Sequence, residues 1–278
     1  MYNINLELES RIDREKYIGK IFESKHYGEF SVKGVYGKDR TGTKTYVCEF
    51  VKTKYQSIVT AGNINKGNAK DLLLPSIYNH GYIGNFYNNV RELKSYVTWV
   101  NMLKRVYSKD ELVKNPTYID AFINERWHCF KNFNEDYSKI LGVDKIIEYP
   151  NIKFCLDKDI ITDTKTYSLN NCCFIPEQIN NIFINKQITN TAGYEGTYYL
   201  EDDLVYISAV KYKGKKISLG RFLDVREAYE KYHIKKKEIL LLYLKDFYWI
   251  DSKIKNACLN KLERQYTQTI NNNIKVVI

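Results

Sequence analysis

The chain has 278 residues, and its 43 lysine and arginine side chains outnumber its 33 aspartate and glutamate side chains, so the formal net charge is +10. This charge favours a polyanionic partner, and the length allows two or three domains. The longest apolar run, Ile239 to Leu244, is far shorter than the ~20 residues that span a bilayer, and no secretory signal pattern follows Met1. These features exclude a membrane partner and predict a soluble intracellular protein, while DNA, RNA and an acidic protein stay open as partners.

Residues 1–85 are predicted to form a small β module. Two runs rich in β-branched and aromatic residues, Tyr46 to Val51 and Tyr55 to Thr60, follow a turn signal at Gly37 to Thr43. No helical period appears before Asn68. The first predicted domain is therefore a small module built mainly of strands.

Residues 86–190 form the second predicted domain, and here the apolar period becomes helical. One helix face is predicted from Trp99, Met102, Leu103 and Val106. A second stripe, made of Trp127, Phe130 and Phe133, predicts a short helix packed in the core. A third helix is predicted from Ile175 to Ile184.

Residues 191–278 form the third predicted domain, in which apolar and polar residues alternate over two strands, Val205 to Tyr212 and Lys215 to Phe222. A Lys-Gly turn joins the two strands. Asp224 is placed to cap the N-terminus of the helix that follows, and helices are expected to end near Tyr266. The domain is predicted to be a three-stranded sheet packed on a helix.

The stretch LDKDIITDTKTYSLNNCCFIP runs from Leu156 to Pro176 and carries the candidate chemistry. Carboxylate and amide oxygens suit a divalent cation such as Mg or Mn, which would act on a phosphodiester. The candidate metal ligands are Asp157, Asp159 and Asn171. Lys158 joins them as a fourth candidate catalytic residue, because its ammonium group can steady phosphate charge.

Local signals in this stretch predict a hairpin and a helix start. Turn-rich residues 162–166 suit the connection between two extended pieces, and Asn170 or Asn171 suits a helix N-cap. Strand alternation places Lys158 on the opposite side from the two aspartates.

The stretch contains no histidine, so the usual base for activating water is missing. An aspartate with an ordinary pKa near 3.9 is a poor base unless burial or a neighbouring carboxylate raises that pKa. Six cysteines are present, and no Cys-x-x-Cys spacing points to zinc, so reduced thiols are predicted.

Several motifs recur in a fixed order along the chain. They are Y-x-x-W-x-x-M-L-x-R-x-Y from Tyr96 to Tyr107, NPTY from Asn115, ERWHCFKNF from Glu125, and LDKDI with YSLNNCCFIP and IN from Leu156 to Asn180. In this order the chain resembles a family of bacteriophage HNH-type homing-endonuclease-like proteins, and GKIF, YGEF and YIGN resemble the small N-terminal module of the phage versions. The resemblance implies a hairpin-and-helix (ββα) central unit, a divalent metal, double-stranded DNA as partner, and the cytoplasm of an infected bacterial host.

The chain departs from this family at several positions. Val106 stands where the family usually has cysteine, and Leu169 with Asn170 replace the Pro-Glu of YSPENC. Together with the missing histidine, these departures predict weak or lost metal-dependent cleavage.

The third domain contains LGRF and REAYEKY and is similar to an Apetala-two (ethylene-response-factor) type DNA-binding domain. Domains of this type lay a three-stranded sheet in the major groove, with alternate residues facing the bases. The resemblance implies DNA contacts from one face of the sheet, made by Tyr198, Lys211, Lys216 and Ser218 beside Ile207 and Ala209.

The sequence thus predicts an α+β protein of three parts: a small N-terminal β module, a central HNH-like ββα and helical unit, and a C-terminal three-stranded sheet plus helix. Its predicted function is binding of double-stranded DNA with weak or lost cleavage. The alternative is a non-enzymatic DNA- or protein-binding factor, such as a phage regulatory or anti-defence protein, on a degenerate nuclease scaffold.

Overall fold

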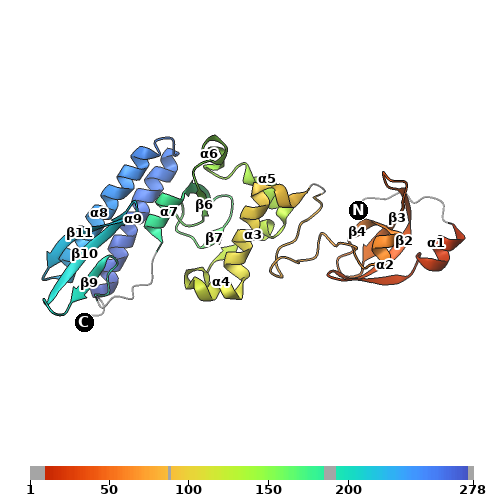
Figure 1. The fold of residues 1–278 in the computed structure, drawn as a ribbon, viewed down its shortest axis with the longest axis horizontal. Coiled ribbons are helices and arrows are strands. Elements are labelled where there is room, and N and C mark those ends of the chain that lie inside the picture. Colours follow the sequence, from red (N-terminus) through yellow and green to blue (C-terminus); the bar gives the residue numbers. More distant parts are fainter. Residues whose placement is uncertain (1–9, 87–88, 185–191, 275–278) are drawn as a thin grey trace. The chain divides into compact units, whose positions relative to one another are not determined.

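The computed structural model describes residues 10–86, 89–184 and 192–274 (Figure 1). The chain divides into two compact units, Met1–Glu135 and Asp136–Ile278. Helices and strands occur in both units, so the predicted α+β class is confirmed. The finer division into three domains stays a prediction.

The first unit contains a four-stranded antiparallel sheet in the order β1-β2-β3-β4. Its strands are β1 (Ile21–Ser24), β2 (Gly28–Lys38), β3 (Lys44–Phe50) and β4 (Gln56–Thr60). Phe30 pairs with Phe50, and Tyr46 pairs with Val59, and all four side chains are buried in one apolar cluster. The two predicted strands are confirmed.

Two short helices lie in this region, where no helix was predicted: α1 (Arg11–Lys16) and α2 (Ala61–Asn65). Each begins at a hydroxyl side chain that accepts a backbone hydrogen bond, Ser10 for α1 and Thr60 for α2. Five or six residues are too few to show a helical period, which is why the pattern missed them.

The helical part of the first unit is organised around α3 (Lys94–Tyr107). All four residues of its predicted apolar face are buried. The Nε1 group of Trp99 donates a hydrogen bond to the carbonyl oxygen of Trp127 at 2.6 Å. The shorter elements are the 3-10 helices η1 (Val90–Glu92), η2 (Pro116–Tyr118) and η3 (Glu125–His128), with α4 (Lys109–Lys114), β5 (Phe122–Ile123) and α5 (Phe130–Tyr137).

The second unit begins with a hairpin and a helix. Its first elements are α6 (Val143–Glu148), β6 (Phe154–Asp157), β7 (Thr166–Tyr167), β8 (Cys173–Pro176) and α7 (Glu177–Phe183). Strand β6 pairs antiparallel with β8, and α7 follows β8 directly. A hairpin and a helix are present, but the partner of β6 is β8 rather than β7, the extended piece that follows the predicted connection at residues 162–166. The HNH-like character of this unit stays a prediction.

A three-stranded antiparallel sheet follows in the order β11-β10-β9, made of β9 (Thr197–Leu200), β10 (Val205–Tyr212) and β11 (Lys215–Phe222). The bounds of β10 and β11 are those predicted. Lys213 and Gly214 both have positive φ, 46° and 82°, as a tight type I′ turn requires. As predicted, the Asp224 side chain caps α8 (Val225–Asp246), accepting from the backbone N–H groups of Arg226 and Glu227 at 2.6 and 3.1 Å.

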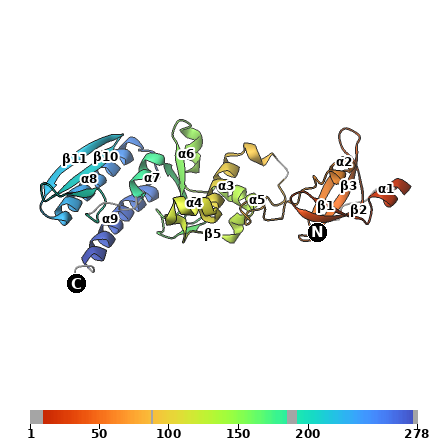
Figure 2. The same cartoon turned by 60° about the horizontal axis from the view of Figure 1, so that its bottom comes forward.

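Helices α8 and α9 (Ser252–Ile274) lie side by side (Figure 1 and Figure 2) and join the hairpin to the sheet within this unit. One buried cluster contains Ile160, Cys173, Ile175, Ile179, Phe183, Leu240, Leu244, Ile250, Ile254, Cys258 and Leu262. A second cluster packs Val210 of β10 against Tyr229 and Tyr232 of α8. Helix α9 continues past Tyr266, so the predicted end of the helices was too early.

All six cysteines lie in the described residues, and none of them forms a disulfide there. Among the described helices, none combines the length and the apolar character needed to cross a membrane.

A paired substitution tests the packing of the sheet on α8. Gly196 and Gly193 both have a φ of +72°, but a methyl group on Gly196 would overlap the ring of Tyr232, whereas Gly193 has open space at that position. Both alanine variants carry about 1–2 kcal/mol of backbone strain. Gly196→Ala is expected to lower the free energy of unfolding by about 1–3 kcal/mol more than Gly193→Ala, because only the former overpacks the core. Chemical denaturation of both variants measures this difference. Equal losses of unfolding free energy would show that the Tyr232 ring moves aside without cost.

Candidate functional site

Asp157 is the last residue of β6 and pairs with Cys173 of β8. Its Oδ1 atom accepts the backbone N–H groups of Asp159 at 2.9 Å and Ile160 at 2.8 Å. Such an aspartate-capped turn reverses the chain at the end of a strand. Burial, and next the negative charge of Asp159, raise the pKa of Asp157 above its ordinary value. Asp157 is therefore a weaker acid than a surface aspartate.

Asp159 binds two ammonium groups. The Nζ atom of Lys158 lies 2.9 Å from its Oδ2, and Nζ of Lys261 contacts its Oδ1. Each lysine side chain is only 8% exposed, whereas the Asp159 side chain is 30% exposed, so two buried ammonium groups meet a half-buried carboxylate. Burial favours the protonated carboxyl, but Lys261 and then Lys158 outweigh it and hold the pKa of Asp159 below its ordinary value.

The predicted direction of Lys158 was wrong, since its ammonium group faces a carboxylate. Strand alternation holds only within a strand, and β6 ends at Asp157. Beyond that residue the aspartate-capped turn redirects the chain, so Lys158 and Asp159 point to the same place.

Lys261 comes from α9 and was missed by the sequence reasoning. It is separated from Asp159 by 102 residues. A signal was present: Ile254, Cys258 and Leu262 recur at the spacing of one helix face, and Lys261 interrupts that apolar stripe. A lysine on the buried face of a helix normally has an acidic partner.

The prediction that Asn170 or Asn171 starts the helix was also wrong. The Nδ2 group of Asn171 donates to the carbonyl oxygen of Thr166 at 3.1 Å, within the turn before β8. Four strand residues separate this turn from α7, which begins at Glu177 after Pro176. Asn171 therefore fixes the loop of the hairpin.

These contacts do not suit a divalent cation held by Asp157, Asp159 and Asn171. Both oxygens of Asp159 bind ammonium groups, and Oδ1 of Asp157 accepts two backbone donors. A metal ion there would have to approach two buried positive charges. Over the described ranges, no group of three or more histidine, cysteine, aspartate or glutamate side chains is placed to hold a metal ion.

The sheet of the second unit presents a second candidate site. Ser208 and Val210 are buried on the side of α8, so the alternate residues of β10 face away from that helix. Cross-strand partners share a face, and the register pairs Tyr198 with Ile207, Ala209 with Ser218, and Lys211 with Lys216. The structure thus brings all four predicted DNA-contacting residues onto one face, called the free face below.

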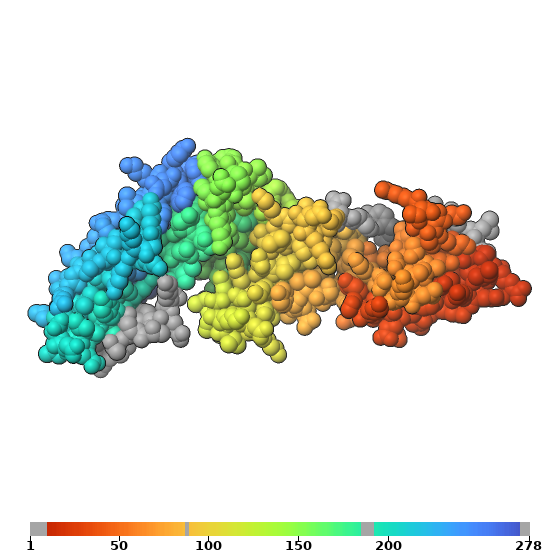
Figure 3. Space-filling view, viewed as in Figure 1, coloured from red at the N-terminus to blue at the C-terminus, as the bar shows by residue number. Residues whose placement is uncertain are grey.

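The free face is polar and accessible. Lys211, Lys216 and Ser218 are exposed, and Tyr198 is half-buried. The Lys216 ammonium group lies 3.2 Å from the Tyr198 hydroxyl and 4.8 Å from the centre of its ring. The space-filling view shows β10 and β11, in cyan, at the surface of the molecule (Figure 3).

Arg221 also lies on the free face, and the sequence reasoning missed it. Simple alternation from Ser218 places Arg221 on the opposite side, but a β-bulge shifts the register between Ser208 and Ala209. Arg221 consequently pairs with Ile207 and joins the free face, where its Nη1 group lies 2.6 Å from Oδ2 of Asp203. Gly220 in the strand interior is the sequence signal for such a bulge.

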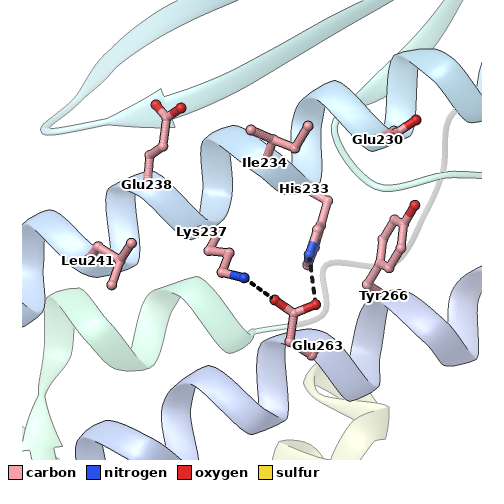
Figure 4. Close-up of a pocket in the computed structure, with 8 residues that line it drawn as sticks. All are labelled: Glu230, His233, Ile234, Lys237, Glu238, Leu241, Glu263 and Tyr266. Carbon is pink, nitrogen blue, oxygen red and sulfur yellow. Dashed lines mark hydrogen bonds and ion pairs between the residues drawn. The ribbon is translucent and has the colours of Figure 1, made fainter.

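A shallow groove between α8 and α9 gathers a further set of polar side chains (Figure 4). Lys237 and His233 point toward Glu263, with nitrogen-to-oxygen distances of 2.6 and 3.5 Å, and Tyr266 stacks on the His233 ring. Burial lowers the pKa of His233, although Glu263 opposes this shift. These groups pair with one another and fasten α8 to α9.

The chain has no match among known protein families, curated proteins or solved structures. Its resemblance to the phage nucleases and to the Apetala-two type domain therefore rests on its motifs and stays a prediction.

A matched pair of variants tests the different environments of the two aspartates. Asp159→Asn removes the partner of two buried lysines and is expected to lower the free energy of unfolding at pH 7 by about 3 kcal/mol. Asp157→Asn keeps the oxygen that accepts two backbone donors and loses a charge that burial disfavours, so little loss is expected.

Acidic pH should reduce the difference in unfolding free energy between Asp159→Asn and Asp157→Asn. The pKa of Asp159 is lowered in the folded protein, so its stabilisation is present above the pKa of an unfolded aspartate and disappears as the pH falls through the folded value. Denaturation curves at neutral and acidic pH measure this. A larger loss from Asp157→Asn than from Asp159→Asn at pH 7 would contradict the assignment.

Proposed function

We propose that this protein binds double-stranded DNA through the free face of the β9-β10-β11 sheet and that its hairpin unit has weak or lost cleavage activity. The observation that carries the proposal is the collection of Tyr198, Lys211, Lys216, Ser218 and Arg221 on the side of the sheet away from α8. Helix α8 covers the other side and supports the sheet from behind.

The side chains of the free face divide into two chemical classes. Lys211 and Lys216 are exposed cations at one end of the strands, and they suit phosphate oxygens. Tyr198, Ser218 and Arg221 offer hydroxyl and guanidinium groups that suit base edges, and arginine pairs well with guanine. A β-sheet surface can enter the major groove, so both classes can act together.

The charge of the whole chain supports the same partner. A net charge of +10 attracts polyanions from a distance, and neutralised phosphates release counterions. The resemblance to phage proteins adds the cytoplasm of an infected bacterium as the proposed location.

The contacts of the hairpin favour the reading in which cleavage is weak or absent. The raised pKa of Asp157 suits a base, but one of its oxygens already accepts two backbone donors. Asp159 is neutralised by Lys158 and Lys261. A non-enzymatic DNA- or protein-binding factor on a nuclease-like scaffold is therefore the second candidate function.

Duplex binding is expected to fall steeply with salt, and Lys211→Ala with Lys216→Ala should weaken it. Loss of two phosphate contacts reduces the slope of log affinity against log salt by about two. The matched control is Lys231→Ala with Lys245→Ala, which removes the same charge from exposed positions of α8. Fluorescence anisotropy with a labelled duplex at several salt concentrations measures both pairs.

If both double variants lost the same amount of affinity for DNA, the effect would come from net charge alone. The free face would then not be the binding surface. If the affinity for DNA did not change with salt concentration, phosphate contacts would not be the source of binding.

Plasmid nicking tests the remaining activity. With Mg²⁺ or Mn²⁺ we expect at most slow nicking, abolished by Asp157→Ala, while the variant still binds DNA because its sheet is unchanged. Gel analysis of supercoiled plasmid over time measures the rate. Rapid cleavage that survives both Asp157→Ala and Asp159→Ala would place an active site elsewhere in the chain.

A further inference from the structure

Two buried positive charges, Lys158 of the hairpin and Lys261 of α9, lie beside the two aspartates of the hairpin. Counted over the whole residue, Lys158 and Lys261 are 7% and 6% exposed, and both ammonium groups contact Asp159. Lysine is rarely buried to this extent without a charged partner. The two buried lysines are therefore balanced by the two half-buried aspartates beside them.

Lys261 is held by its surroundings as well as by its charge. It lies on α9 between Cys258 and Leu262, both buried in the apolar cluster that includes the hairpin. Its ammonium group lies 5.4 Å from the centre of the Phe183 ring and reaches Oδ1 of Asp159 from there. The stem packs in the core while the head faces the carboxylate.

A divalent cation would compete with Lys261 for the same atoms. Magnesium and manganese prefer carboxylate oxygens, and Oδ1 of Asp159 is the oxygen that Lys261 occupies. Without Lys261, the group of Asp157, Asp159 and Lys158 would carry one positive charge against two carboxylates. Removing this lysine therefore turns a neutral cluster into one that attracts cations.

We propose that Lys261 is the built-in cation of the hairpin: its ammonium group takes the place of a divalent metal on Asp159 and keeps that metal out. This deepens the proposed loss of cleavage by naming the residue responsible. The cation competition itself does not depend on DNA binding.

Binding of Mn²⁺ to the full chain tests the proposal, followed by loss of the free-ion electron paramagnetic resonance signal. Lys261→Met removes the charge and keeps the length of the side chain, and Lys261→Arg is the matched control that keeps the charge. Lys261→Met is expected to bind one Mn²⁺ at least about tenfold more tightly than the wild-type chain or Lys261→Arg. Adding Asp159→Asn to Lys261→Met should abolish the new site.

The proposal is overturned if Lys261→Met gains no site, or if the wild-type chain already binds Mn²⁺ at a site that Asp159→Asn removes. The second comparison needs no lysine variant, so it can overturn the proposal even if Lys261→Met does not fold; Lys261→Gln, which also removes the charge, then takes the place of Lys261→Met. DNA binding of the same proteins in a metal chelator is measured separately, so a failure of the DNA proposal leaves this result intact.

Discussion

The packing of α9 against two different neighbours is the constraint on which the second unit depends. Cys258 and Leu262 of this helix lie in the apolar cluster of the hairpin, while Tyr266 stacks on Tyr229 of α8, which supports the sheet. A fragment that began at residue 191 would lack the hairpin residues that cover this cluster. The hairpin and the sheet both pack on α9 within the unit Asp136–Ile278.

Local signals were sufficient to predict much of the fold. The strands β10 and β11 have their predicted bounds because alternation and a Lys-Gly turn act over a few residues. The cap at Asp224 and the buried face of α3 are also short-range patterns. The short helices α1 and α2 escaped prediction, because a single turn of helix leaves no period to read.

The candidate sites were predicted less completely, because their decisive features are not local. All four residues predicted on the free face share it, but Arg221 reaches that face only through a bulge in the pairing of β10 with β11. The partnership of Lys261 with Asp159 joins residues 102 positions apart. No period or motif in either segment specifies that contact, which is set when α9 packs on the hairpin.

The burial of the thiols makes the chain a selective target for cysteine chemistry. Burial raises the pKa of Cys48, Cys172 and Cys258 to about 12, so the reactive thiolate is scarce there at neutral pH. Cys155, on strand β6, is the one cysteine that is not buried. A maleimide dye added to the native protein should therefore attach first to the hairpin, and the other cysteines should become available as the chain unfolds. Cys155 of the hairpin could therefore carry a fluorescent label without any engineered cysteine.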